Sequence, residues 1–171
     1  YFADYMVEWL DEIEPEIRAN TYRGYSGNVG NHIVPYFYPR RIKIQELKVS
    51  DLEDFYKYLV FEKSKSDGSE PLSPTTITHI HRCISKALND AARKGIITVN
   101  VATLARKPHS VKFKSQYLNE RQVNELLKTV KDTPIEVPVT ICAVFGLRRG
   151  EVLGLKWKAV DMENRTITIS E

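Results

Sequence analysis

The sequence predicts a mainly α-helical protein made of two units: a four-helix domain followed by the start of an α+β domain. Three observations lead to this prediction. Apolar residues recur at helical spacing over residues 2–94, and a basic segment around residues 104–115 has few large apolar side chains. After residue 161 the apolar period changes to the alternation of a strand. With 171 residues, 42% of them hydrophobic, the chain can hold two cores.

The composition narrows the class of protein. A net charge of +3 permits nucleic-acid binding without requiring it. The two cysteines, Cys83 and Cys142, lie in apolar helical patterns and predict reduced, buried thiols. No apolar run approaches the roughly 20 residues of a membrane helix, and no signal-peptide pattern follows Tyr1. We therefore expect a soluble, cytoplasmic protein with no membrane partner, no metal and no cofactor.

The first two helices are expected at residues 2–14 and 20–33, ending at Pro15 and before Pro35, because proline disrupts a helix interior. Glycine recurs at every third position of the second helix, which costs about 1 kcal/mol of helix propensity each time. Tight helix packing explains this better than close approach to DNA. The glycines concerned are Gly24, Gly27 and Gly30.

The next two helices begin with capping signals. The third, residues 50–62, opens with Ser50 as its N-cap and Glu53 three residues later, the capping-box pattern. The fourth, residues 73–94, carries signals at both ends: Ser73 as N-cap, Pro74 at the first helical position and Gly95 as the stop.

The fourth helix separates into an apolar and a polar side. The apolar side is predicted to face the core and comprises Ile77, Ile80, Ile84, Ala87, Leu88 and Ala91. The polar side can donate hydrogen bonds to phosphates and base edges, although any amphipathic helix has a solvated side. Its candidate DNA contacts are Thr75, Thr76, His79, Arg82 and Lys86. His79 and His81 point to different sides, which argues against a shared metal ion.

Further candidate DNA contacts lie in two other places. Thr21 and Arg23 occur on the second helix. The basic segment, residues 107–116, is predicted to be an interdomain linker that could neutralise phosphates. The candidate DNA contacts in this segment are Lys107 and Lys114, and Arg106 directly before it is a third.

Beyond the linker, Asn119 is predicted to cap a helix marked by apolar positions from Leu118 to Val130. A further helix is expected at residues 136–145 with Gly146 ending it, and a strand at residues 166–170.

Residues 146–161 read G-L-R-R-G-E-V-L-G-L-K-W-K-A-V-D. Arg148 stands between two helices, with Glu151 one helical turn later to orient it. Arginine suits a phosphodiester because it stays protonated and its planar fork makes two parallel bonds. From spacing alone, however, a structural Arg–Glu pair is the better interpretation.

This segment resembles the first catalytic box of the tyrosine recombinases, the phage-integrase family, which reads roughly G-L-R-x-[GS]-E-[LIV]-x-x-L-x-W-x-D-[IV]-D. Ala159 stands where the family often has an acid. The resemblance extends upstream and includes integrases of phages and conjugative transposons. It is carried by residues 32–35, 73–77, 87–91, 100–102 and 117–119.

The resemblance implies a four-helix SAM-like core-binding domain (residues 1–106), a basic linker (107–116) and the incomplete α+β start of a catalytic domain (117–171). It implies a mobile-element site-specific recombinase that cuts and rejoins DNA through a 3′-phosphotyrosine, without a metal ion. Arg148 would bind the scissile phosphate and Glu151 would support it. The partners would be double-stranded DNA and other recombinase subunits, in a tetramer.

The family's lysine, H-x-x-R box and nucleophilic tyrosine follow this box, so we expect the chain as given to bind DNA without cleaving it. Two alternatives remain. One is a cleavage-deficient DNA-binding regulator with the same fold, and the other is a helical protein-interaction module. DNA binding that weakens steeply with salt would argue against the second.

Overall fold

The computed structural model describes residues 1–61, 72–107 and 116–169. The chain divides into two compact units, Tyr1–Lys112 and Phe113–Glu171. None of the helices in the described part of the chain has both the length and the apolarity needed to span a bilayer.

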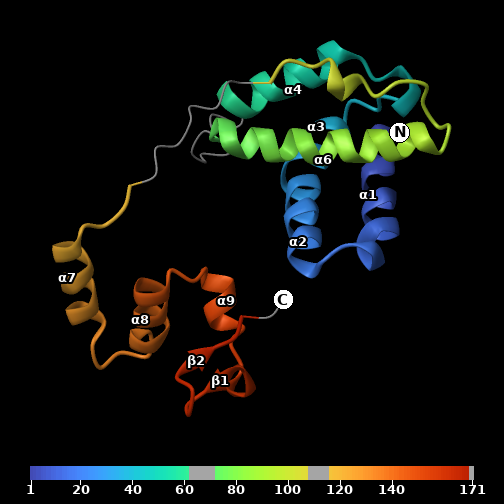
Figure 1. Cartoon of the computed structure of the whole chain (residues 1–171). Helices are drawn as coiled ribbons and strands as arrows, with labels where there is room; N and C mark the ends of the chain where they lie inside the picture. Colours follow the sequence, from blue (N-terminus) through green and yellow to red (C-terminus); the bar gives the residue numbers. More distant parts are fainter. Residues whose placement is uncertain (62–71, 108–115, 170–171) are drawn as a thin grey trace. The chain divides into compact units, whose positions relative to one another are not determined.

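All regular secondary structure in the described part of the first unit is helical (Figure 1). Its longest helix, α6, has 20 residues and contacts α1, α2 and α4. The α-helices are α1 (Phe2–Ile13), α2 (Ala19–Asn28), α3 (Val34–Phe37), α4 (Val49–Phe61) and α6 (Pro74–Arg93). A π-helical turn covers Val29–Ile33, and short 3-10 turns cover Glu14–Glu16, Ile44–Glu46 and Val101–Thr103.

The core of the first unit lies between these helices. All six residues predicted for the apolar side of α6 are fully buried, which confirms the prediction. Each large aliphatic side chain buried in this way stabilises the fold by about 1.5–3 kcal/mol. Aromatic rings fill the space between α1, α3 and α4: Phe37 lies 4.9 Å from Phe2 and 5.0 Å from Phe55 between ring centroids.

The ends of α6 confirm the signals in its sequence. The backbone N–H of Thr76 donates to Ser73 Oγ at 3.1 Å, so Ser73 is the N-cap, and Pro74 is the first helical residue. At the other end Gly95 has a φ of 71°, a conformation that glycine adopts without strain. Local chemistry therefore sets both ends of this helix.

The predicted helix end before Pro35 is wrong. The chain stays helical through Tyr36 and Phe37, both of which are buried. The π turn explains this, because the Val34 N–H bonds back to Val29 and a new helical segment starts there. Pro35 then occupies the first turn of that segment, where a missing N–H costs nothing.

The predicted N-cap at Ser50 is also wrong, because α4 already begins at Val49. Lys48 is the residue before the helix, and the Asp51 carboxylate, in the first turn, accepts from its backbone N–H at 2.8 Å. Glu53 does not complete a capping box. It accepts instead from the backbone N–H of Arg106 at 3.0 Å, far away in sequence.

Tight packing does not explain the glycines of the second helix. Apart from the neighbouring residues and the helix's own backbone, no described atom lies within 4 Å of a Cβ built at Gly24 or Gly30, and at Gly27 the nearest is the Asn31 amide at 4.0 Å. The expectation of close helix contact at these positions is therefore wrong.

The second unit begins with α7 (Glu120–Val130), α8 (Glu136–Phe145) and α9 (Arg149–Leu153). A predicted cap and a predicted stop are confirmed: Asn119 and Gln122 form a capping box, and Gly146 ends α8 with a φ of 66°. A 3-10 turn at Trp157–Ala159 leads into a hairpin of β1 (Val160–Asp161) and β2 (Thr166–Ile167). The strand expected over residues 166–170 is shorter in the described residues, and residue 170 lies outside them.

The two cysteines are free thiols, as expected. Cys83 is fully buried in α6, and burial raises the pKa of its thiol to about 12. Cys142, on α8, is only half-buried, so the prediction of burial holds for Cys83 alone.

Candidate nucleic-acid interface

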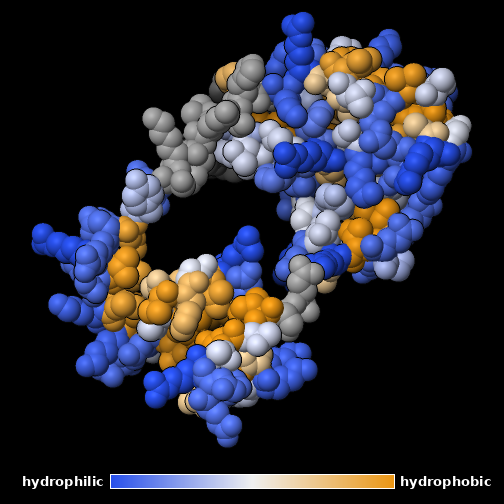
Figure 2. Space-filling view, viewed as in Figure 1, coloured by the Kyte–Doolittle hydropathy of each residue, from blue (hydrophilic) through white to orange (hydrophobic). Residues whose placement is uncertain are grey.

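The polar side of α6 faces away from the core. Thr75, His79 and Arg82 are exposed, and Lys86 is half-buried. Asn89 and Arg93 continue the same line and are exposed as well. Hydrophilic side chains cover this side of the first unit in Figure 2. Thr76 differs from the others, because it is half-buried and its hydroxyl lies 2.9 Å from Ser73 Oγ at the helix cap.

A hollow of about 520 Å³ lies along this side of α6. We call it the α6 hollow. Four cations line it, together with one carboxylate, an imidazole, an amide and a hydroxyl: Arg82, Lys86, Arg93, Lys107, Asp90, His81, Asn89 and Ser85. This excess of cations favours an anionic ligand.

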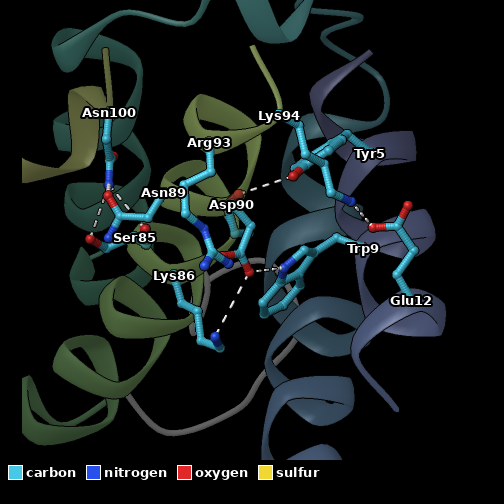
Figure 3. Close-up of polar contacts among 11 residues, drawn as sticks. Tyr5, Trp9, Glu12, Ser85, Lys86, Asn89, Asp90, Arg93, Lys94 and Asn100 are labelled. Carbon is cyan, nitrogen blue, oxygen red and sulfur yellow. Dashed lines mark hydrogen bonds and ion pairs between the residues drawn. The ribbon is translucent and has the colours of Figure 1, made fainter. Parts of the chain in front are cut away.

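Asp90 is the carboxylate at the base of the hollow, and its side chain is only 9% exposed (Figure 3). It accepts from the Trp9 indole N–H at 2.8 Å, which ties α1 to α6. It also pairs with Arg93 and, at 3.8 Å, with Lys86. Desolvation acts to raise the pKa of Asp90, but the bonds from Trp9 and Arg93 outweigh it and the pKa is lowered. Asp90 therefore stays ionised and holds two of the cations.

His81 and His79 lie on different sides of α6, His81 buried and His79 exposed. The Nδ1 atom of His81 is 2.9 Å from the Tyr56 hydroxyl of α4. Burial lowers the pKa of His81, and the nearby charges of Lys107 and Arg82 lower it further. His81 is therefore a neutral imidazole at the edge of the hollow. Among the described residues no group of three or more His, Cys, Asp or Glu side chains is placed to hold a metal ion.

The segment after α6 is fastened to the first unit as far as Lys107. Asn100 donates to Ser85 and Asn89 of α6, and Glu53 binds the backbone of Arg106. Because these bonds hold the chain after α6 against the first unit, Lys107 lies at the α6 hollow. The rest of the expected linker, including Lys114, lies outside the described residues.

The candidates on α2 do not join the hollow. Thr21 and Arg23 are both exposed, but neither lines it. The structure thus brings together Arg82, Lys86 and Lys107 of the predicted set, and leaves Thr21, Arg23, Thr75, Thr76, His79 and Arg106 outside the hollow.

Arg148 and Glu151 form a separate site in the second unit. Arg148 precedes the first residue of α9, and the Glu151 carboxylate accepts from its backbone N–H at 2.7 Å. The same carboxylate accepts from the Arg148 guanidinium at 2.9 Å. These bonds, the backbone bond foremost, lower the pKa of Glu151. The Arg148 side chain is 87% exposed, so its remaining N–H groups face solvent and can bind an oxyanion.

Sequence reasoning missed the roles of Asp90 and Asn100. The spacing of Asp90, four residues after Lys86 and three before Arg93, is a signal that could have identified its ion pairs. Its bond to Trp9 spans 81 residues, and no local pattern reveals such a contact.

Comparisons with known proteins agree with this architecture. Residues 1–60 match the family model described as "Phage integrase, N-terminal SAM-like domain". The chain is 25% identical over 168 residues to an integrase of Saccharopolyspora erythraea, covering 98% of the chain and 37% of that relative. It is 21% identical over 174 residues to a tyrosine recombinase XerC-like protein of Caldanaerobacter subterraneus, covering 98% of the chain and 42% of that relative.

Among solved structures, the fold is similar to that of the Tn1549 transposon integrase in complex with circular intermediate DNA. The TM-score is 0.67 at 20% identity, and the match covers 99% of this chain and 53% of that one. The chain thus spans about two fifths of the length of the curated relatives and about half of the solved one. Residues 1–60 thus match the SAM-like domain of phage integrases, and the chain as a whole is similar to integrases and to a tyrosine recombinase.

Proposed function

We propose that this chain is the DNA-binding and early catalytic part of a site-specific recombinase. In this proposal residues 1–106 form the core-binding domain, residues 107–116 the linker and residues 117–171 the first part of the catalytic domain. The whole protein would cut and rejoin duplex DNA through a tyrosine. The tyrosine oxygen attacks the phosphodiester and forms a 3′-phosphotyrosyl bond, and the strand leaves with a 5′-hydroxyl. A 5′-hydroxyl then reverses the step and releases the tyrosine.

The α6 hollow is the single observation that carries DNA binding. One side of α6 is fully buried in the core. The opposite side presents three cations around one carboxylate that is already paired, and Lys107 adds a fourth from the segment after α6. A core does not need this arrangement, whereas a phosphate backbone is attracted by it. Arg82, Lys86 and Lys107 are the proposed contacts in the hollow, with Thr75, Thr76 and His79 toward the start of α6. Thr21, Arg23, Arg106 and Lys114 extend the proposed track on either side.

Arg148 is the proposed ligand of the scissile phosphate. Its guanidinium is exposed, permanently charged and held at the start of α9 by Glu151. Donors aimed at the non-bridging oxygens stabilise the charge that develops as the tyrosine attacks. Glu151 is a positioning residue, because it acts on the phosphate only through Arg148. The proposed partners are double-stranded DNA and further recombinase subunits in a tetramer.

DNA binding is tested with the double variant Arg82→Ala, Lys86→Ala on a mixed-sequence duplex. Removing two phosphate contacts should weaken binding and should lower the slope of log K against log salt by about 2. The matched control is Lys43→Ala, Lys57→Ala, which removes two exposed lysines of the same unit outside the hollow. Wild-type protein that binds no duplex DNA at low salt would instead favour a helical protein-interaction module.

Catalysis is tested in the whole protein by comparing neighbouring arginines. Arg148→Ala should reduce strand cleavage by at least about a hundredfold, because one oxyanion donor contributes that much, while DNA affinity stays nearly constant. Arg149→Ala is the control, since Arg149 makes no ion pair in the described residues, and it should keep its cleavage activity. Wild-type protein that binds but never cleaves would identify a DNA-binding regulator, and cleavage retained by Arg148→Ala would remove Arg148 from the reaction.

A further inference from the structure

The α6 hollow contains neutral side chains as well as cations, and residues behind it determine which of their atoms face outward. Asn89 and His81 are the two that matter here. The Asn89 amide presents either its oxygen or its NH₂ group, depending on its orientation. The neutral His81 ring donates from the nitrogen that carries the hydrogen and accepts at the other. Their hydrogen-bond partners settle both choices.

Asn100 determines the orientation of Asn89 (Figure 3). The backbone N–H of Ala102 donates to Asn100 Oδ1 at 2.9 Å, and Asn100 Nδ2 donates to the Ser85 carbonyl at 3.0 Å. Backbone groups cannot exchange donor and acceptor roles, so the Asn100 amide has only this orientation. Its Nδ2 then donates to Asn89 Oδ1 at 2.7 Å. This bond directs the oxygen of Asn89 toward Asn100, and its NH₂ group is left for the hollow.

Tyr56 determines which nitrogen of His81 carries the hydrogen. Burial raises the pKa of the Tyr56 phenol, so the hydroxyl keeps its hydrogen. His81 Nδ1, at 2.9 Å, is the partner of that hydroxyl among the described residues. If Nδ1 carried the hydrogen instead, the buried phenol O–H would have no acceptor among the described residues, which is unfavourable for a buried donor. Tyr56 therefore donates, and Nε2 of the neutral ring carries the hydrogen on the side away from Tyr56.

The carboxylate of the hollow is directed toward protein donors. Asp90 receives bonds from Trp9 and Arg93 and pairs with Lys86. Ser85 adds a hydroxyl, whose hydrogen can be donated. The hollow consequently offers N–H and O–H donors and positive charge, and its one carboxylate is already paired.

We infer that the α6 hollow is a built site for one backbone phosphate of DNA, in which Asn89 and His81 are neutral donors positioned by Asn100 and Tyr56. A phosphodiester presents only acceptor oxygens, which this donor-rich surface matches. Adenine read through its N6 and N7 atoms requires a protein acceptor as well as a donor, and Asn89 Oδ1 is directed toward Asn100. This inference rests on the proposed DNA binding and deepens it. It adds two residues, Asn100 and Tyr56, that orient the donors of the hollow without contacting DNA themselves.

The test is Asn89→Asp in the whole chain. An aspartate at this position keeps an oxygen for Asn100 but turns the outward NH₂ into a second oxygen, so the fold stays and the donor is lost. Affinity for duplex DNA should fall by about tenfold, the effect of losing one charge-assisted hydrogen bond. The loss should be equal for duplexes of different sequence, because phosphate contacts carry no sequence information. The control Gln45→Glu makes the same charge change on an exposed residue of the same unit and should change affinity by less than about threefold.

The positioning role has a separate readout. In the wild type, ¹⁵N NMR should find His81 neutral with its hydrogen on Nε2 at pH 7. In Tyr56→Phe the ring hydrogen of His81 should no longer be confined to Nε2, and DNA binding should weaken. If Tyr56 were only structural, the substitution would lower the melting temperature but leave the ¹⁵N signals of the His81 ring unchanged.

The outcomes separate the two proposals. Wild-type protein without salt-dependent duplex binding overturns the proposed function itself. A second outcome would overturn the phosphate site alone. In it the wild type binds duplex DNA and the double variant Arg82→Ala, Lys86→Ala binds more weakly, but Asn89→Asp binds DNA as well as the control Gln45→Glu does. A loss confined to particular sequences would identify a base contact and would also overturn the phosphate site, as would a wild-type His81 with its hydrogen on Nδ1.

Discussion

The two units use their apolar residues differently. Trp9 in the first unit is fully buried, whereas Trp157 in the second is 87% exposed. In the described part of the second unit only Val130 and Val152 are buried hydrophobic residues, and Figure 2 shows apolar side chains gathered on its surface. Large apolar side chains exposed there include Val137, Val144, Phe145 and Leu153. The same helical periodicity therefore leads to a closed core in one unit and to an open apolar surface in the other.

This difference shows which features depend on a core. In the second unit the cap at Asn119, the stop at Gly146 and the Arg148–Glu151 pair all form without one, because their bonds join residues at most four apart. In the first unit the α6 hollow depends on contacts between distant elements, such as Trp9 with Asp90. The proposed catalytic arginine is thus held by local chemistry, and the proposed DNA surface by the fold.

The largest expected contrast is between the two tryptophans. Trp9→Ala should lower the free energy of unfolding by about 3–5 kcal/mol, because it removes a fully buried ring and leaves a cavity. Trp157→Ala should change it by less than about 0.5 kcal/mol, as for other exposed positions. Urea unfolding followed by far-UV circular dichroism measures both. Equal losses would mean that the second unit covers Trp157 in solution.

The second contrast is between two carboxylates that hold arginines. At pH 7, Asp90→Asn should lower the free energy of unfolding by about 1–3 kcal/mol, because Asp90 is buried and its bonds are charge-assisted. Glu151→Gln should lower the urea midpoint less, because Glu151 is half-buried and its partner Arg148 is exposed.

The Asp90 effect should depend on pH. Because the folded-state pKa of Asp90 lies below its unfolded value of about 4, its contribution is fully present above that pH. It is lost as the pH falls through the folded-state pKa. Wild type and Asp90→Asn should therefore converge in stability in acid, and a constant difference down to pH 2 would exclude the ion pairs as its source.

The smallest contrast is between two glycines. Gly24→Ala should stabilise the first unit by about 0.5–1 kcal/mol, because Gly24 lies inside α2 with open space around a new Cβ. Gly146→Ala should destabilise by about 1–2 kcal/mol, because its φ of 66° is unfavourable for other residues. Thermal unfolding distinguishes the signs. A stabilised Gly24→Ala protein that binds DNA more weakly would place a DNA contact at α2.

Much of the fold was predictable from local signals. The buried side of α6, its two ends, the cap of α7 and the end of α8 all follow from periodicity and capping. The errors occurred where tertiary packing overrides such signals. The helix passes Pro35 because Tyr36 and Phe37 are buried beside Phe55. The capping pattern at Ser50 fails in part because Glu53 binds the backbone of Arg106.

The candidate sites divide in the same way. The sequence by itself determined the amphipathic pattern of α6 and the position of Arg148 three residues before Glu151, because helical geometry converts such spacings into neighbours. Only the tertiary structure decided that Lys107 joins Arg82 and Lys86, that Asp90 is anchored to Trp9, and that Asn100 and Tyr56 stand behind Asn89 and His81. These contacts join residues 11 to 81 positions apart. Their geometry depends on how whole helices pack, which no local pattern of residues specifies.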